Sequence, residues 1–401
     1  MSDLFIGRQP IFDRKLKVIG YELLYRNCQV NNAAIKNEDS ATSRVILNTF
    51  IEFGLSRLVG TQSAFINLTR NFFTSKIPIP VPPHQLVFEV LENITIDDKF
   101  IQAIRELHHK GYRIALDDVV IPAAIIPLLQ YSDILKIDIR QISPDQLAER
   151  VHQLRKYPVK LLAEKVETPD EYDFCRKLGF DYFQGYFLCK PKIIEGREIP
   201  PNRLTILRMV ATLQNPEVDF KHLEEIISQD VSLGYKLLRL ANSAFYGVPT
   251  RVKSIRQAMT LIGLKQLRSW LTLFLMTEID NKPSELSVIA MVRAKMCELI
   301  SQAIQKPAPE TYFLVGLFSV LDAFFDLPMP DILATLPLST EINQALIEHT
   351  GDFGVILHLT LEYEKSNWDE IEKTGIPSSI FRDSYIQAVD WATLLTTSLI
   401  E

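Results

Sequence analysis

The sequence predicts an α/β fold, a (β/α) barrel, followed by a second domain made only of helices. Residues 1 to about 195 alternate short apolar segments with helical patterns, and repeated strand–helix units imply a parallel sheet. About seven or eight such units in so short a stretch suit a closed barrel better than an open sheet. After residue 200, apolar residues recur only at three- and four-residue spacing, which predicts helices.

The expected strands of the first domain are short apolar segments that end at polar residues. They cover residues 18–25, 64–68, 86–91, 113–117, 134–139, 160–166 and 182–188. The helical patterns between them cover residues 41–53, 97–108, 122–129, 144–156 and 169–178. Asp97 stands at an expected N-cap, and Gly111 and Gly179 fall where helices should stop.

A polar segment with two prolines and a glycine, residues 195–202, is typical of a short interdomain linker. We therefore expect domains at residues 1–197 and 198–401. Helices of the second domain are expected at 204–213, 220–228, 232–242, 255–262, 264–276, 285–304, 311–319, 330–334, 341–348, 354–363 and 384–398. Asp230 and Ser254 stand at expected N-caps.

Composition narrows the class of protein. The net charge of −6 and the lack of a long basic run give no support for a nucleic-acid polymer as partner. The first residues lack the pattern of a signal peptide, and no apolar run reaches about 18 residues, so we expect no membrane segment. Four scattered cysteines without a Cys-x-x-Cys pair suit a cytoplasmic protein.

Polar side chains stand at the carboxyl ends of nearly all expected strands, where barrels carry their functional sites. Asp117 and Asp118 follow one strand directly, although an Asp turn cap explains this pair equally well when it is taken alone. So many convergent acids with a single lysine are tolerated only with cations among them. An oxygen-rich ligand set favours Mg²⁺ or Mn²⁺, and two such ions suit attack of water on a phosphodiester.

Several motifs in order match one family. Residues 21–26 read Tyr-Glu-Leu-Leu-Tyr-Arg, residues 163–167 read Ala-Glu-Lys-Val-Glu, and residues 184–186 read Gln-Gly-Tyr. With Asp117 and Asp118 between them, they resemble the motifs of the EAL-type cyclic di-GMP phosphodiesterases over essentially residues 1–195. The resemblance implies an EAL-type TIM-like barrel that opens cyclic di-GMP to linear pGpG with two Mg²⁺ or Mn²⁺ ions.

The resemblance also implies roles for individual residues. The metal ligands would be Glu22, Asn67, Glu89, Asp117, Asp118 and Glu164, with Asp117 bridging the two ions. The catalytic residues would be Lys136, which holds the attacking water, with Glu164 and Glu167. Arg26 and Gln184 would bind the substrate, and Glu92 would support the loop after Asp118.

Ordinary structural roles are the alternatives for the uncharged and basic members of this set. Arg26 and Gln184 also suit surface or capping positions, and Asn67 suits a turn. Lys136 also suits a structural ion pair with Asp138 or Asp117. The acids are harder to explain without a metal.

The chain departs from the family pattern beside the acids. Residues 119–123 read Val-Val-Ile-Pro-Ala where the family has Phe-Gly and a glycine-rich loop, and these residues disfavour the same positive-φ backbone. Lys165 replaces the usual glycine between the two acids, where it would partly neutralise the cluster or cover it. Two functions follow: a phosphodiesterase, or a non-catalytic scaffold or cyclic di-GMP receptor.

The second domain has a distinctive run from Asp230 to Ala244, which segments 254–263, 293–298 and 313–318 continue. Together they resemble the HDOD domain, a helical relative of HD-type phosphohydrolases, over about residues 200–390. Ser319 and Val320 stand where catalytic HD enzymes have His-Asp, which implies a degenerate, non-catalytic domain. The pair Asn242 and Ser243 would recognise a partner or fix a tight helix turn.

The predicted partners follow from the two resemblances. The barrel would bind cyclic di-GMP, and the HDOD-like domain would regulate it or contact protein partners. Because EAL barrels commonly dimerise near the altered loop, a homodimer is also expected. A nuclease is disfavoured by the acidic balance and the lack of a basic run.

Overall fold

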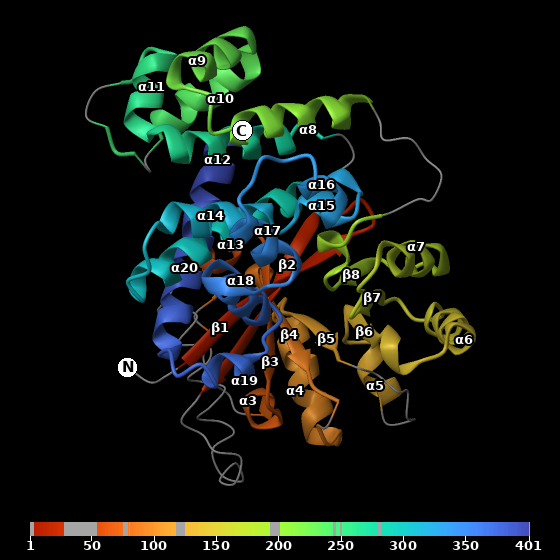
Figure 1. The fold of residues 1–401 in the computed structure, drawn as a ribbon. Helices are drawn as coiled ribbons and strands as arrows, with labels where there is room; N and C mark the ends of the chain where they lie inside the picture. Colours follow the sequence, from red (N-terminus) through yellow and green to blue (C-terminus); the bar gives the residue numbers. More distant parts are fainter. Residues whose placement is uncertain are drawn as a thin grey trace. The chain divides into compact units, whose positions relative to one another are not determined.

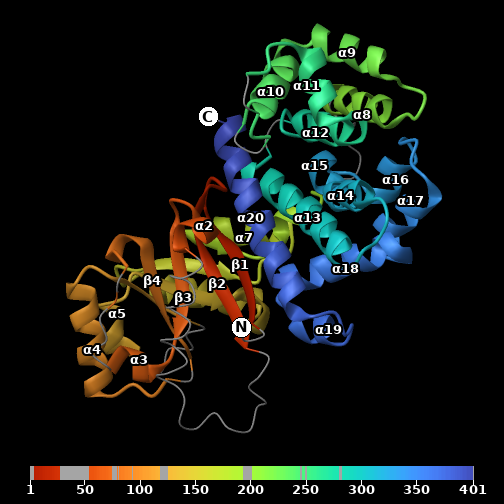
Figure 2. The ribbon, with the colours of Figure 1, turned by 90° about the vertical axis from the view of Figure 1, so that its left-hand side faces the viewer.

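The computed structural model describes residues 4–27, 54–74, 79, 81–92, 94–117, 125–192, 201–243, 246–248, 251–279 and 282–400. The chain forms two compact units, Met1–Phe187 and Leu188–Glu401, and each is described by itself (Figures 1 and 2). The linker-based boundary at residues 197 and 198 stays a prediction, since residues 193–200 lie outside the described ones.

The first unit contains a closed eight-stranded barrel, which confirms the predicted barrel. Its strands follow one another around the barrel in chain order, and all neighbours are parallel except those of β1. The strands are β1 Leu4–Asp13, β2 Val18–Asn27, β3 Ser63–Leu68, β4 Leu86–Val90, β5 Arg113–Leu116, β6 Ile134–Asp138, β7 Lys160–Glu164 and β8 Tyr182–Gln184.

Strand β1 was not predicted, and it makes the sheet depart from an all-parallel arrangement. A glycine and Pro10 interrupt its apolar pattern, and such residues are depleted in strands. A tight turn joins β1 to β2, because Asp13 Oδ1 accepts hydrogen bonds from the backbone N–H groups of Lys15 at 2.8 Å and Lys17 at 2.9 Å. A connection this short allows only antiparallel pairing.

Helices alternate with the parallel strands and lie outside the barrel (Figure 1). Asp97 Oδ1 accepts a hydrogen bond from Phe100 N at 2.8 Å, and Gly179 ends its helix with φ 106°, so both boundary predictions are confirmed. The helix expected at 41–53 and the start of that at 122–129 lie outside the described residues. The helices are α2 Leu55–Val59, α3 Arg70–Thr74, α4 Asp98–His109, α5 Ile126–Leu129, α6 Pro144–Leu154 and α7 Pro169–Leu178.

A layer of buried apolar side chains fills the barrel beneath the site. It is formed by Ile11, Phe65, Val87, Ala115, Ile134 and Leu162, each from a different strand. Gly20 of β2 makes room for it, since a Cβ there would lie 2.6 Å from the Phe65 ring. Because alternate residues of a strand face the same side, the residues two positions further along also point into the barrel.

The second unit is helical throughout its described residues, as predicted. Asp230 and Ser254 cap α10 and α11 by accepting hydrogen bonds from Leu233 N at 3.1 Å and Gln257 N at 3.2 Å. The helices are α8 Pro201–Gln214, α9 Phe220–Gln229, α10 Val231–Ala241, α11 Ile255–Ile262, α12 Leu264–Met276, α13 Ser284–Ala303, α14 Pro309–Phe318, α15 Leu321–Phe325, α16 Met329–Leu333, α17 Thr340–Ile347, α18 Gly351–Glu364, α19 Trp368–Glu372 and α20 Ser378–Ile400.

Asn242 ends α10 and ties the following segment to it. Its Nδ2 donates to Leu238 O at 2.8 Å and to Val252 O at 2.9 Å, and its Oδ1 accepts from Val252 N at 2.7 Å. These bonds match the turn-fixing alternative for this residue. Among the described helices, none is both long and apolar enough to cross a membrane.

Candidate active site in the barrel

A polar layer lies directly above the apolar layer of the barrel, at the carboxyl ends of the parallel strands. Asn67, Glu89 and Lys136 each stand two residues beyond a core residue of the same strand, and so do Asp117 and Glu164. Glu22 of β2 and Gln184 of β8 complete the layer with Gln9 of β1, which runs in the opposite direction. Strand alternation thus brings together residues that are far apart in sequence.

Lys136 lies at the centre of this layer and is only 1% exposed. Its ammonium is 2.8 Å from Glu164 Oε1, 3.0 Å from Glu89 Oε2, 3.3 Å from Glu22 Oε2 and 3.7 Å from Asp117 Oδ1. One positive charge therefore faces four carboxylates, and the group carries a net negative charge if all are ionised.

Two amide side chains hold Glu22 from either side. Asn67 Nδ2 donates to Oε1 of Glu22 at 2.8 Å, and Gln184 Nε2 donates to Oε2 at 2.6 Å. Gln184 Nε2 also donates to Gln9 Oε1 at 2.8 Å. These bonds fix the Glu22 carboxylate and use the nitrogen of the Asn67 amide, so the Asn67 Oδ1 atom takes no part in holding Glu22.

Burial and crowding of like charges shift the pKa values in the layer. Burial raises the pKa of Glu164 to about 8, even though Lys136 is beside it. Burial, and then the charge of Glu22, raise the pKa of Glu89 well above its usual range. Burial alone would lower the pKa of Lys136, but the surrounding carboxylates hold it well above its ordinary value. The positive charge of Lys136 is thus too small to balance the four carboxylates around it.

The donor set suits a hard divalent cation. Asn67 Oδ1 and Glu89 Oε1 are buried without a hydrogen-bond partner, and an oxygen left so is costly unless something positive contacts it. Carboxylate and amide oxygens are the ligands that Mg²⁺, Mn²⁺ and Ca²⁺ prefer. Among the described residues, no three Asp, Glu, His or Cys side chains already converge as ligands of one ion, and the Lys136 ammonium lies between the acids instead.

A cavity of about 410 Å³ opens above the polar layer. This volume is within the range of small-molecule sites. The cavity is lined by Gln9, Glu22, Leu24, Leu91, Glu92, Asp117, Lys136, Gln141, Glu164, Lys165 and Gln184. Two polar lining residues, Gln9 and Gln141, were not predicted, and Gln9 was missed because β1 was not predicted. Its only signal was a polar residue within an apolar segment.

Other residues expected in the site lie around this cavity or outside the described structure. Glu92 lines the cavity. Glu167 is about half exposed and pairs with Arg140 Nη2 at 2.9 Å, away from Lys136. Arg26 stands two residues beyond Leu24 on β2, past the described cavity wall. Asp118 and the altered loop 119–123 lie outside the described residues.

Comparison with known proteins gives a family for both halves. The EAL domain family matches residues 4–191, and the HDOD domain family matches residues 199–327. The uncharacterized protein YuxH of Bacillus subtilis is 34% identical, with 97% of this chain and 98% of YuxH covered. The cyclic di-GMP phosphodiesterase CdgJ of Vibrio cholerae is also 34% identical, with 98% of this chain and 93% of CdgJ covered.

This chain belongs to the EAL–HDOD family. Among solved structures, Klebsiella pneumoniae BlrP1 with calcium and cyclic di-GMP is 24% identical and covers 46% of this chain and 55% of its own, with a TM-score of 0.38. The two full-length relatives carry the family assignment.

The second unit, Leu188–Glu401, contains the HDOD match and is called the HDOD unit below. In this unit an arginine side chain contacts Ser319. Arg293 of α13 is 5% exposed and pairs with Glu364 of α18 through two bonds, at 2.6 and 2.9 Å. Its Nη1 donates to Ser319 Oγ at 3.3 Å. A guanidinium and its carboxylate therefore lie beside Ser319.

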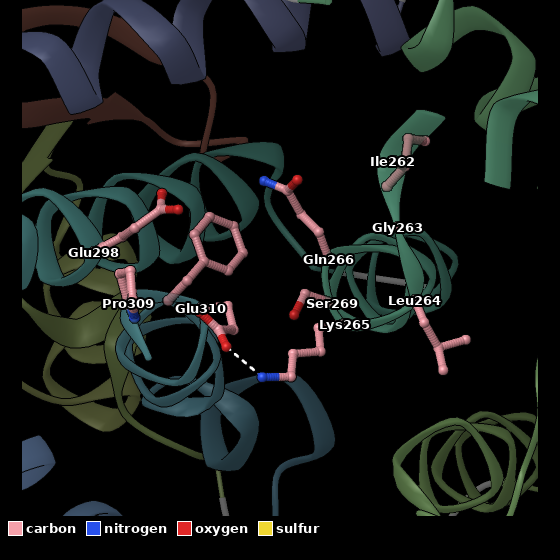
Figure 3. A pocket seen from close by; sticks show the side chains of 10 residues that line it. Ile262, Gly263, Leu264, Lys265, Gln266, Ser269, Glu298, Pro309 and Glu310 are labelled. Atoms are coloured by element: carbon pink, nitrogen blue, oxygen red, sulfur yellow. Dashed lines mark hydrogen bonds and ion pairs between the residues drawn. The ribbon is translucent and has the colours of Figure 1, made fainter. Parts of the chain in front are cut away.

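The HDOD unit also has a pocket of about 380 Å³ between the start of α12, α13 and the start of α14. Figure 3 shows Gln266, Ser269 and Glu298 around it, and the ion pair between Lys265 and Glu310 at 2.5 Å. Phe313 and Ile262 add apolar surface. Among the described residues, the pocket brings together no metal-binding group.

Proposed function

We propose that the barrel is a cyclic di-GMP phosphodiesterase that hydrolyses its substrate to linear pGpG with two divalent ions. The observation that carries this proposal is the polar layer in which four carboxylates surround Lys136. The full-length relative CdgJ, named a cyclic di-GMP phosphodiesterase, supports the same activity for this chain.

The proposed ligands are those that the resemblance to the EAL family implies. Glu22, Asn67, Glu89 and Asp117 would hold one ion, and Asp117 with Asp118 and Glu164 would hold the other. We expect Mg²⁺ or Mn²⁺ in these positions. When bound, such ions lower the pKa of water and neutralise phosphate charge.

The chain's own residues then position water and substrate. Lys136 would donate a hydrogen bond to the attacking water, and Glu164 Oε1, 2.8 Å from the Lys136 ammonium, would accept its proton. Gln184 and Arg26 would bind the dinucleotide, and Glu92 would steady the loop at the cavity wall. Glu167 would be a further catalytic residue, and it pairs with Arg140.

A second candidate function is a cyclic di-GMP receptor or scaffold without turnover. It is favoured by the sequence of loop 119–123, which lacks the glycines of the family pattern, and by the central ion pairs of Lys136. A receptor would bind cyclic di-GMP and leave it intact.

We further propose that the HDOD unit is a non-catalytic interaction module in a cytoplasmic protein. The Arg293–Glu364 pair beside Ser319 supports the loss of catalysis, because a guanidinium cannot serve as a metal ligand. Val231 and Tyr235, one turn apart on α10, are 85% and 61% exposed, which suits contact with a protein partner. We also propose that the protein forms a homodimer through its barrel, as the resemblance to the EAL family implies.

One assay tests the proposed activity. Purified protein is incubated with cyclic di-GMP and Mn²⁺ or Mg²⁺, beside a Glu22→Ala variant, and pGpG is measured. We expect wild-type product formation and at least a hundredfold lower rate in the variant, at roughly 3 kcal/mol of lost transition-state stabilisation.

Equal product from the two proteins, or none from either, would overturn the phosphodiesterase. Calorimetric titration with cyclic di-GMP and Ca²⁺ then separates a receptor, which binds the nucleotide, from an inert barrel, which does not.

A further inference from the structure

Apart from the proposed metal ions, the side chains of the cavity wall offer little positive charge to a ligand. A cyclic dinucleotide brings two phosphate charges to a wall already rich in carboxylates. Among the described residues that line the cavity, Lys136 and Lys165 are the cationic ones. Lys136 is buried and surrounded by four carboxylates, which leaves Lys165 as the described wall cation that solvent and substrate reach.

The backbone of Lys165 is held in place beside the polar layer. It follows Glu164 at the end of β7 and has φ 56°, in the left-handed region where the family's usual glycine is favoured. Arg140 Nε donates to the Lys165 carbonyl at 3.4 Å. A lysine in this conformation costs some stability, and such strain persists where the surroundings fix it, often at functional sites.

The side chain of Lys165 lies at the rim of the cavity, where it is 62% exposed. Its ammonium is 2.5 Å from Asp138 Oδ2, and that carboxylate is itself nearly buried at 3% exposure. Because the Lys165 side chain is mostly exposed, solvent and a ligand at the rim can reach it while it is paired with Asp138.

Asp138 keeps other partners when the ammonium leaves it. Its Oδ1 accepts from Arg140 N at 2.8 Å, and its Oδ2 accepts from Gln141 Nε2 at 3.1 Å. Gln141 also lines the cavity. Asp138 thus stays hydrogen-bonded without the lysine, and it holds the Lys165 ammonium at the rim until a ligand binds.

We propose that Lys165 is a substrate-binding residue, whose ammonium moves from Asp138 to a phosphate of the cyclic dinucleotide at the cavity rim. The proposal rests on the proposed function, since it concerns the same substrate. It assigns binding rather than chemistry to Lys165, so loss of its charge should lower the affinity and leave the chemical step nearly unchanged.

The test compares charge variants with a matched control. Lys165→Asn removes the charge while keeping a side chain that tolerates positive φ, and Lys165→Arg keeps the charge. Lys160→Gln is the control, because Lys160 begins the same strand, is 59% exposed and pairs with Asp181 at 3.2 Å. Calorimetry measures the binding of cyclic di-GMP in the presence of Ca²⁺, at low and at high salt.

We expect Lys165→Asn to weaken binding about tenfold, as for loss of one charge-assisted hydrogen bond, and to flatten its salt dependence. Lys165→Arg and Lys160→Gln should bind like wild type. Under turnover with Mn²⁺, Lys165→Asn should raise KM and leave kcat within about twofold.

Lys165→Gly guards against a folding effect, because glycine relieves the backbone strain; it should bind as weakly as Lys165→Asn. Wild-type affinity in the neutral variants, or equal weakening in Lys165→Arg, overturns the role of Lys165 while the proposed function stands. If the wild-type protein binds no cyclic di-GMP, the proposed function fails, and the role of Lys165 with it.

Discussion

Lys136 shows how a single residue holds the barrel site together. Its ammonium is buried and lies within 4 Å of four carboxylates. Breaking a buried ion pair by removing one partner is strongly destabilising, because the remaining charge has no compensation. We expect Lys136→Met to lower the free energy of unfolding of the metal-free protein by about 3–5 kcal/mol.

Divalent ions should restore part of that loss, since they supply the missing positive charge. Urea unfolding followed by circular dichroism, in EDTA and in Mn²⁺, measures both effects. Lys177→Met, at an exposed position of α7, is the control and should change little. A Lys136→Met protein as stable as wild type in EDTA contradicts the central role of the ion pairs.

At the scale of elements, the connection after β8 depends on one close backbone approach. Gly185 has φ 146°, and a Cβ there would lie 2.0 Å from Val166 O. Val166 N donates to Gln184 O at 3.0 Å, so the same approach aligns β8 beside the segment after β7. Gly185→Ala should therefore cost about 2–4 kcal/mol and misplace Gln184, which holds Glu22.

The variant Gly111→Ala is a control that measures the cost of positive φ without the steric clash expected at Gly185. Gly111 also has positive φ, 88°, but a Cβ there would meet its nearest atom at 3.7 Å, so it should cost only about 1 kcal/mol. Urea unfolding by circular dichroism compares the two variants. Equal losses would show that φ, and no close approach, makes glycine necessary at Gly185.

Several helix boundaries, and the presence of polar side chains at the ends of neighbouring strands, could be predicted from sequence, because caps and strand ends are local signals. Asp97 and Ser254 cap their helices as expected. Strand β1 could not be predicted, because Pro10 and a glycine interrupt its apolar pattern. Gln9, which lies in this strand, was therefore not predicted as a site residue. The fourfold pairing of Lys136 also escaped prediction, since it depends on how all eight strands stagger around the barrel.

At the scale of the whole molecule, the position of the tryptophans allows unfolding of the two units to be followed separately. The three tryptophans of the chain, Trp270, Trp368 and Trp391, all belong to the second unit. Tryptophan fluorescence therefore reports unfolding of the HDOD unit, whereas nucleotide binding reports on the barrel. This division allows a substitution in one unit to be followed separately in each.

The stability contributed by the Arg293–Glu364 pair of the HDOD unit can be measured by tryptophan fluorescence. Arg293→Met leaves Glu364 without its bidentate partner, and we expect the fluorescence-detected free energy of unfolding to fall by about 3–5 kcal/mol. Glu364→Met leaves a buried guanidinium and should cost as much. The double variant Arg293→Met with Glu364→Met removes both charges together, so it should be clearly more stable than either single variant. If the losses of the single variants simply add in the double variant, the pair is not coupled, and the guanidinium has some role other than neutralising Glu364.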